Sequence, residues 1–471
     1  MKPPQHADTI VALATPLGEG GISVIRITGP DAFHLTGKGF RGKSTIADAQ
    51  SHTAHFGRIV DENEVALDQV VVVVFRSPNS YTGEDTAEIS CHGGVLVTRK
   101  IIEALIRRGA RHATPGEFTK RAFLNGKLDL SQAEAVADLI HAGSDVAYRS
   151  SLAQLHGNLS AKIQNLRNQL IESISLLELE LDFVEDGIEL IDKSKVIEQV
   201  RQAIGNADEL TGSYQAGRIY REGVKVVIAG VPNAGKSSLL NALLNENRAI
   251  VTEIPGTTRD VIEEGLSIGG VMFKVADTAG VRETTNFIEQ EGLRRTEAQS
   301  QNCDVLLLVM DASRDLSQQE QQSLGLLVRQ KTPADAVKLV ALNKIDLVPQ
   351  LNGEVTRRSD FVSDFPNIKV SALTGEGVGE LKSLLLRLVL NSSPAFSNEG
   401  KVTITNARHV DSLKRTRVSL GLALESLEKR QSGEFVTVDL RRALDSLGEI
   451  TGEVTTDEIL NNIFSKFCIG K

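Results

Sequence analysis

Cysteine is scarce in this 471-residue sequence: the three present, Cys91, Cys303 and Cys468, are far apart, and none belongs to a Cys-x-x-Cys pair. So small and odd a number excludes a disulfide framework and a cysteine-based zinc site, and it favours a reducing compartment. Long apolar runs are also missing, since none approaches the ~18 residues that span a bilayer. The first residues form no apolar signal segment. We therefore expect a cytoplasmic protein with no membrane partner.

Positive charge is in deficit, because 52 lysines and arginines face 61 aspartates and glutamates, which gives a net charge of −9. That balance excludes a general polyanion binder, so any contact with nucleic acid needs a local basic surface. Two basic clusters, each more simply interpreted as a solvated helix face, are Arg107, Arg108 and Arg111, and Lys414, Arg415 and Arg417.

The hydrophobic pattern changes along the chain. Apolar residues over 22–27 and 69–75 predict strands, and apolar spacings of three and four over 95–108 predict a helix. Leucine and isoleucine recur at the same spacings from 159 to 181, which predicts one long amphipathic helix, more simply part of a bundle than a coiled-coil seam. Strand and helix patterns then alternate, as is typical of a mostly parallel sheet wrapped by helices, before helical patterns return.

We therefore expect a multidomain protein of α/β and all-α parts, in which a nucleotide domain is inserted into one helical domain. The length itself predicts roughly three domains. The predicted ranges are a mixed α/β N-terminal domain over 1–125, the first helical part over 126–222, the nucleotide domain over 223–390 and the second helical part over 391–471.

A phosphate-binding loop is the clearest motif. Residues 230–237 fit G-x-x-x-x-G-K-[ST], directly after a predicted strand and before a predicted helix. In such a loop, backbone N–H groups and the helix N-terminus face phosphate oxygens. Lys236 supplies positive charge to the β- and γ-phosphates, and the Ser237 hydroxyl coordinates Mg²⁺.

Three more motifs follow in the order found in GTPases, each after a predicted strand. In 277–280 (Asp-Thr-Ala-Gly), Asp277 holds Mg²⁺ through water. In 343–346 (Asn-Lys-Ile-Asp), Asp346 selects guanine, because adenine lacks the two donors that its carboxylate accepts. The expected GTP-binding residues, which include 371–373 for the guanine carbonyl, are Asn233, Ala234, Gly235, Lys236, Ser237, Ser238, Thr252, Glu253, Ile254, Pro255, Gly256, Thr257, Thr258, Asp277, Thr278, Ala279, Gly280, Asn343, Lys344, Asp346, Ser371, Ala372 and Leu373.

The site departs from a Ras-like enzyme in two places. Val281 follows Gly280 where a Ras-like enzyme has the glutamine that orients water, so another group has to orient it. Thr258, in the segment 256–260 that is typical of a first switch, is predicted to complete the Mg²⁺ coordination. The second departure is Asn233 in the phosphate loop. Its side chain could hold a monovalent cation beside the phosphates, or the position could be one that tolerates many residue types. The candidates for orienting water are Glu283, Glu289 and Glu291.

These motifs resemble the TrmE–Era group of GTPases, and segments outside the nucleotide domain narrow the resemblance to the MnmE (TrmE) family of tRNA modification GTPases. Those segments are 8–12, 14–16, 78–85, 92–94, 115–118, 128–134 and the terminal Phe-Cys-Ile-Gly-Lys of 467–471. The resemblance implies an N-terminal folate-binding and dimerisation domain, a two-part helical domain and an inserted Ras-like P-loop GTPase domain.

The resemblance also implies an activity and its partners. A homodimer works with the FAD protein MnmG (GidA), in a heterotetramer or larger complex, on certain tRNAs. Together they add a carboxymethylaminomethyl or aminomethyl group at C5 of the wobble uridine. The carbon comes from 5-formyltetrahydrofolate or another one-carbon derivative. GTP, Mg²⁺ and K⁺ are the other implied cofactors, and no FAD or NAD site is expected in this chain, because no strand is followed by G-x-G-x-x-G.

Specific residues are carried over by the resemblance. It implies that Glu289 orients the attacking water, which settles the choice among the three glutamates. The implied folate ligands are Arg26, Glu84, Lys127 and Lys471, and the implied K⁺ ligands are Asn233, Thr252, Ile254 and Thr257. A carboxylate suits the donors of a pterin, and cations suit the glutamyl tail.

Two alternatives stay open at this point. A ribosome-assembly GTPase that uses hydrolysis only as a timer shares the nucleotide motifs, although the helical tail is unlike an RNA-binding KH domain. Cys468 is either a nucleophile or, more simply, a small residue packed beside Phe464 and Phe467.

Overall fold

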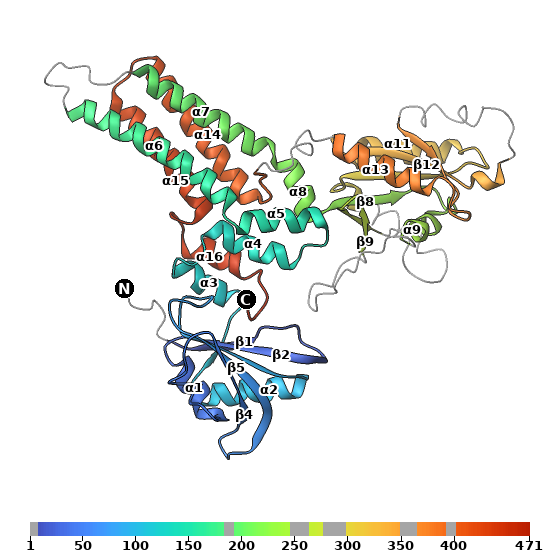
Figure 1. Ribbon diagram of the computed structural model, residues 1–471. Coiled ribbons are helices and arrows are strands. Elements are labelled where there is room, and N and C mark those ends of the chain that lie inside the picture. The colour runs from blue at the N-terminus through green and yellow to red at the C-terminus, as the bar shows by residue number, and fades with distance from the viewer. Residues whose placement is uncertain (1–7, 183–192, 245–262, 277–297, 349–364, 392–401) are drawn as a thin grey trace. The chain divides into compact units, whose positions relative to one another are not determined.

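The computed structural model describes residues 8–182, 193–244, 263–276, 298–348, 365–391 and 402–471 (Figure 1). The chain divides into two units. Unit 1 comprises Met1–Ala137, Gln154–Ala203 and Arg415–Lys471, and unit 2 comprises Asp138–Ala153 and Ile204–Lys414. The four predicted domain ranges are a finer division, and their boundaries stay a prediction.

Unit 1 begins with a seven-stranded sheet of order β3-β4-β5-β6-β2-β1-β7, antiparallel except for the β1–β7 pair. This arrangement confirms the two strands predicted near the N-terminus. The strands are β1 (Ile10–Leu13), β2 (Gly20–Thr28), β3 (Phe40–Gly42), β4 (Thr53–Val60), β5 (Ala66–Phe75), β6 (Thr86–Gly93) and β7 (Arg111–His112).

The two faces of this sheet are covered differently. On one face, Ile25 and Ile27 of β2 share a buried core with residues of α1 (Ala32–Gly39) and α2 (Val95–Arg107). Because side chains alternate along a strand, the residues between them belong to the other face. There α3 (Glu117–Leu124) packs Phe118 against β1. The helix predicted over 95–108 is confirmed as α2.

The helical part of unit 1 joins segments far apart in the sequence. The predicted amphipathic helix is α6 (Asn158–Asp182), whose leucine and isoleucine stripe is buried from Leu159 to Leu177. It lies beside α15 (Gly433–Thr451), and Nη1 of its Arg167 donates to the carbonyl oxygen of Leu444. The other helices with residues in this unit are α4 (Leu130–Ile140), α5 (Asp145–Leu155), α7 (Lys193–Gly212), α14 (Ala407–Glu428) and α16 (Asp457–Phe464). The bundle is therefore discontinuous in sequence, as predicted.

Unit 2 contains a six-stranded sheet of order β13-β12-β11-β8-β10-β9, parallel except for the β9–β10 hairpin. This confirms the predicted parallel sheet. Its strands are β8 (Val224–Ala229), β9 (Glu263–Ile268), β10 (Val271–Ala276), β11 (Val305–Asp311), β12 (Val337–Asn343) and β13 (Asn367–Lys369).

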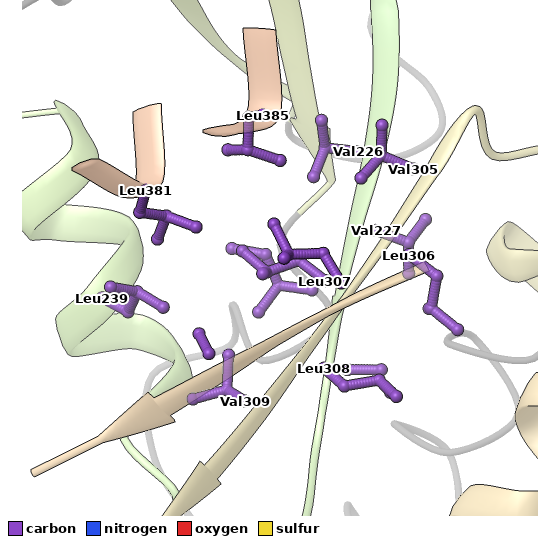
Figure 2. Close-up of a cluster of buried hydrophobic side chains, with 14 of the residues drawn as sticks. Val226, Val227, Leu239, Val305, Leu306, Leu307, Leu308, Val309, Leu381 and Leu385 are labelled. Atoms are coloured by element: carbon purple, nitrogen blue, oxygen red, sulfur yellow. The ribbon is translucent and has the colours of Figure 1, made fainter. Parts of the chain in front are cut away.

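The core of unit 2 forms where helices pack on this sheet. Its helices include α8 (Tyr214–Glu222), α9 (Lys236–Leu244), α11 (Gln318–Gln330), the short 3-10 turn η2 (Ile345–Leu347) and α13 (Val378–Asn391). Figure 2 shows Leu239 of α9 and Leu381 and Leu385 of α13 around the apolar side chains of β8 and β11. The parallel strands β8, β11, β12 and β13 end at one edge, where an α/β sheet usually binds its ligand.

Among the described residues, no helix has the length and apolar character needed to cross a membrane.

Candidate functional site

The phosphate loop connects β8 to α9, as the motif predicts. Nζ of Lys236 donates to the carbonyl oxygens of Gly230 and Val231, each at 3.0 Å. Asn233 has a φ of 60°, in the left-handed region that asparagine tolerates better than most residues. Lys236 and Ser237 open α9, and the backbone N–H groups of a helix N-terminus are suited to an anion.

Asn343 joins this loop to the end of the sheet. Its Nδ2 donates to the carbonyl oxygen of Ala234, and its Oδ1 accepts from the backbone N–H of Ala372, both at 2.9 Å. Gly235 makes room for the contact, because a Cβ added there would lie 2.3 Å from Nδ2, and its φ of 89° also favours glycine. Three of the sequence motifs are thus held together by one buried amide.

The predicted guanine-selecting carboxylate is held by a second motif. Oδ1 of Asp346, in η2, accepts a hydrogen bond of 2.5 Å from Oγ of Ser371. Oγ of Ser371 also accepts from the backbone N–H of Thr374, at 3.2 Å. These bonds fix Oδ1 of the carboxylate, whereas Oδ2 accepts no hydrogen bond in the part of the chain that the structure describes. Leu373, in the same loop, is exposed.

The sequence interpretation missed an ion pair beside this loop. Nζ of Lys344 lies 2.7 Å from Oδ2 of Asp311, and the other carboxylate oxygen accepts from Ser313. Burial raises the pKa of Asp311, but the bonds from Lys344 and Ser313 outweigh burial and lower it. A sequence signal for this ion pair was available, because Asp311 and Asn343 each end an apolar strand. When β11 and β12 pair in parallel, Asp311 lies opposite Asn343 and therefore close to Lys344, the next residue.

Many predicted nucleotide-site residues lie outside the described residues. Among the predicted metal ligands, the structure describes Ser237 for Mg²⁺ and Asn233 for K⁺. The predicted residues that lie outside are Thr252, Glu253, Ile254, Pro255, Gly256, Thr257, Thr258, Asp277, Thr278, Ala279, Gly280, Val281, Glu283, Glu289 and Glu291.

The four predicted folate ligands all belong to unit 1. Glu84, in the loop before β6, is buried, and its Oε2 lies 3.2 Å from Nη1 of Arg121 and 3.4 Å from Oγ1 of Thr28. Lys127 reaches the same loop: its Nζ donates to the carbonyl oxygen of Pro78 at 3.0 Å, and its stem lies against Gly83.

Arg26 lies on the same sheet face as Thr28, two residues earlier in β2. Its Nε and Nη2 both contact Oε1 of Glu88, at 2.9 and 2.8 Å, across the β2–β6 register. Its guanidinium carbon lies 5.2 Å from the ring centre of Tyr81 and 5.7 Å from that of Phe118. Glu88 therefore neutralises Arg26, which the sequence did not reveal because register sets this pairing.

The end of the chain packs against the same part of unit 1. Burial and, after it, the charge of Arg26 lower the pKa of Lys471. Gly470 has a φ of 97°, and a Cβ there would lie 2.0 Å from the carbonyl oxygen of Leu13, which only glycine tolerates. Gly470 thus packs beside β1, whose Ala12 is the register partner of Arg26. That Lys471 binds folate stays a prediction.

Cys468 differs from its simpler interpretation. Its side chain is exposed rather than packed, although Phe464 and Phe467, which precede it in the chain, are buried. The reason is that the backbone makes the contact, since the carbonyl oxygen of Cys468 accepts from the N–H of Gly116 at 3.3 Å.

The first basic cluster is engaged by protein acceptors, and the second is engaged in part. Arg107 bonds to Glu62, Arg108 to the carbonyl oxygen of Val60, and Arg111 to Asp8 and Glu117. Arg415, in the second cluster, pairs with Glu449. The first cluster is therefore not one solvated helix face, because Arg107 ends α2, Arg111 lies in β7 and the cluster is paired within the protein.

Sequence comparisons decide the family. The family described as "MnmE helical domain" matches residues 130–468, and "GTP-binding protein TrmE N-terminus" matches residues 9–127. This chain belongs to the MnmE family. Three relatives carry the name tRNA modification GTPase MnmE. The Cytophaga hutchinsonii protein is 44% identical over 99% of this chain and 98% of its own. Those of Chlorobium phaeobacteroides and Natranaerobius thermophilus are 43% and 42% identical, over 99% and 98% of this chain and 98% and 99% of theirs.

Membership of the MnmE family confirms the predicted enzyme class, a GTPase that functions in tRNA modification. It favours a role in tRNA modification over the ribosome-assembly alternative. The predicted fold class is also confirmed, with a mixed α/β N-terminal part, a discontinuous helical bundle and an inserted P-loop GTPase fold.

Proposed function

We propose that this chain couples GTP hydrolysis to the addition of a carboxymethylaminomethyl or aminomethyl group at C5 of the wobble uridine of certain tRNAs. A tetrahydrofolate derivative such as 5-formyltetrahydrofolate donates the carbon. The observation that carries the proposal is the arrangement in unit 1 of the buried Glu84, which contacts Thr28 on the strand face that also carries Arg26, with the chain end packed at Leu13 of the neighbouring strand β1.

The residue types in this arrangement suit a folate. A buried carboxylate such as Glu84 needs donors, and a pterin ring presents them. Lys471, Lys127 and the partly neutralised Arg26 suit the carboxylates of the glutamyl tail or the carbonyl oxygens of the ring. In this proposal Lys127, which follows α3 and donates to Pro78 in the loop that carries Glu84, also contacts the ligand.

The nucleotide site would use two cations. Ser237 and Thr258 would hold Mg²⁺, with Asp277 acting through water, and Mg²⁺ would neutralise charge on the phosphates. Asn233, Thr252, Ile254 and Thr257 would hold K⁺ beside them, where it takes the role of an arginine finger. The left-handed conformation of Asn233 supports its part in this set, since such strain is often found at binding sites. Glu289 would orient the attacking water.

Homodimerisation through unit 1 would fit an exposed apolar part of its sheet. Phe56 of β4 is exposed, and its register partner, Val71 of β5, is exposed on the same face. An aromatic and a β-branched residue side by side on an open face are typical of an interface core. Dimerisation of the GTPase domains would then accompany K⁺-stimulated hydrolysis.

A flavoprotein partner would supply the redox chemistry. Placing a folate-derived carbon on uracil C5 needs electrons, which GTP hydrolysis does not provide. We therefore propose an MnmG (GidA)-like FAD protein as partner, in a cytoplasmic heterotetramer or larger complex with tRNA. The GTPase cycle would change domain positions during the reaction.

Calorimetric titration of 5-formyltetrahydrofolate into the full chain tests the folate site. A variant that lacks residues 467–471 should bind folate about 10-fold or more weakly, because it loses the cation of Lys471, a loss of about 1.5–3 kcal/mol. Its GTP affinity should match that of the full chain. Equal folate affinity in the two proteins would remove the chain end from the pocket.

A further inference from the structure

Arg121 is fully buried, and its guanidinium gathers three carboxylate residues. Nη1 donates to the carbonyl oxygen of Asp8 at 2.9 Å and lies 3.2 Å from Oε2 of Glu84. Nη2 donates to Oδ1 of Asp8 at 2.9 Å and to Oε1 of Glu117 at 3.0 Å. Asp8 and Glu84 are 113 and 37 positions away in the sequence, so the planar fork of one arginine fixes two distant carboxylates relative to α3.

The cluster carries one surplus negative charge. Asp8, Glu84 and Glu117 stand against two cations, Arg121 and Arg111. Glu117 is the best satisfied carboxylate, since both of its oxygens accept from Arg111 and one of them also accepts from the backbone N–H of Thr114. Glu84 does not contact Arg111 in the described residues, so the surplus charge is least compensated at Glu84.

One oxygen of Glu84 is left over. Oε2 contacts Arg121 and Thr28, whereas Oε1 is buried with no hydrogen-bond partner among the described residues. A buried acceptor without a donor is unfavourable, so this oxygen is suited to a donor that a ligand brings. Nη1 of Arg26, on the same sheet face as Thr28, is a buried donor that also has no hydrogen-bond partner among the described residues. A ring that presents N–H donors next to a carbonyl oxygen would satisfy both.

We propose that Arg121 is a positioning residue that holds Glu84 through Oε2, so that Oε1 is kept for the 2-amino and ring N–H donors of a pterin. This inference rests on the proposed folate site. It assigns to Arg121 the selectivity of that site for ligands with a 2-amino group, although Arg121 itself makes no contact with the ligand.

Arg111 provides a matched control. It bonds to Asp8 and Glu117, two of the three partners of Arg121, but not to Glu84. Arg111→Gln therefore disturbs the same cluster from its outer side and leaves the bond between Arg121 and Glu84 in place. A merely structural role of the cluster would affect both variants in the same way.

The experiment measures the affinities of 5-formyltetrahydrofolate and of its 2-desamino-2-methyl analogue by calorimetry, with the melting temperature of each variant recorded. In the parent protein, loss of the 2-amino group should weaken binding about 10- to 100-fold, because Oε1 of Glu84 stays unpaired. In Arg121→Gln this ratio should fall to a few-fold, and in Arg111→Gln it should match the parent. If Arg121→Gln does not fold, Arg121→Lys decides, since an ammonium keeps the charge but not the fork.

The outcomes separate the two proposals. A parent protein that does not bind 5-formyltetrahydrofolate overturns the folate site and this inference together. One contrary result is a parent that binds folate but binds the 2-desamino-2-methyl analogue equally well, and another is the same affinity ratio in the Arg121 variants as in the parent. Either result overturns the role of Arg121 and leaves the folate site standing. A ratio that collapses equally in Arg111→Gln also overturns it, because the effect would then be structural.

Discussion

Nδ2 of Asn343 donates a hydrogen bond of 2.9 Å to the carbonyl oxygen of Ala234, in the middle of the phosphate loop. The other end of the same amide accepts from the backbone of Ala372. The loop that would hold phosphates and the loop that would hold the base are therefore one hydrogen-bonded unit.

Asp346→Asn should reverse the base preference of the nucleotide site. Oγ of Ser371 already fixes one carboxylate oxygen, so the other would receive the guanine donors. An amide puts a donor there, which faces the donors of guanine and suits the extra carbonyl of xanthine. GTP affinity should fall about 10- to 100-fold and xanthosine triphosphate should become the better ligand, as nucleotide titration would show.

The control for this change is Asp335→Asn, an exposed aspartate in the same unit. It should leave both affinities unchanged. If Asp346→Asn binds GTP as tightly as the parent, Asp346 does not select guanine.

Potassium should accelerate hydrolysis. Val281 cannot orient water, and Asn233 lies in the phosphate loop in a left-handed conformation. A cation placed there would stabilise the transition state by roughly 3 kcal/mol, which is on the order of 100-fold in turnover. Replacing K⁺ by Na⁺, or Asn233 by Ala, should remove most of that acceleration in a phosphate-release assay.

Glu289→Ala should lose turnover and keep GTP binding. Glu283→Ala and Glu291→Ala are matched controls in the same segment, and both should keep turnover. Equal rates in K⁺ and Na⁺ would take the cation out of the mechanism. Loss of turnover in a control variant instead of Glu289→Ala would move the water-orienting role to that glutamate.

Gly470→Ala should loosen the chain end. A Cβ at this position would lie 2.0 Å from the carbonyl oxygen of Leu13, and the φ of 97° is strained for alanine. We expect 5-formyltetrahydrofolate to bind about 10-fold more weakly, consistent with a local strain of about 1–3 kcal/mol. GTP affinity should stay at the parent value.

Gly421→Ala is the matched control. Gly421 lies inside α14, and no atom lies within 4 Å of a Cβ added there. This change should be neutral or slightly stabilising, because alanine favours a helix. A Gly470→Ala protein that binds folate like the Gly421→Ala protein would show that Lys471 does not need its present position.

Acid should remove a stabilising contribution from Glu117. Burial raises the pKa of this carboxyl, but bonds from Arg111, Thr114 and Arg121 outweigh burial and lower the pKa to about 2, from an ordinary 4.5. A folded-state pKa below the unfolded value stabilises the fold above the unfolded pKa and loses that effect as pH falls toward the folded one. The parent should therefore melt higher than Glu117→Gln near neutrality, and the gap should shrink between pH 4.5 and 2.

The control here is Glu103→Gln. Glu103 lies on the exposed side of α2 and pairs with Arg99 at 3.7 Å, a contact that adds little. The melting temperature of the Glu103→Gln protein should equal that of the parent at every pH. A pH-independent gap for Glu117→Gln in calorimetric scans would contradict the role given to ionised Glu117.

Local patterns predicted much of the fold. The three- and four-residue spacing from Leu159 onward predicted α6, and the glycine-rich motif after an apolar strand predicted the phosphate loop. These features depend on residues within a few positions of one another. The placement of the segments 343–346 and 371–373 could be predicted for the same reason, because each follows a strand whose end lies at one edge of the sheet.

Long-range pairings could not be predicted in this way. The Arg26–Glu88 pair depends on the register of β2 and β6, and the Lys344–Asp311 pair depends on that of β11 and β12. Arg121 is in a polar stretch that reads as surface helix, and its burial results from partners far away in the sequence. The four-residue spacing within α3 indicates the bond between Arg121 and Glu117, but it does not indicate the bonds from Arg121 to Asp8 and Glu84.

Mass spectrometry of tRNA nucleosides, with isotopic label in the one-carbon unit of the folate, tests the central claim most directly. The complete mixture contains this chain, the flavoprotein partner, GTP, K⁺, an amine source and substrate tRNA. We predict label at C5 of the wobble uridine in this mixture, and none when the partner is left out or when Glu289→Ala replaces the parent chain. Label incorporated by this chain alone, or modified uridine without label, would contradict the account.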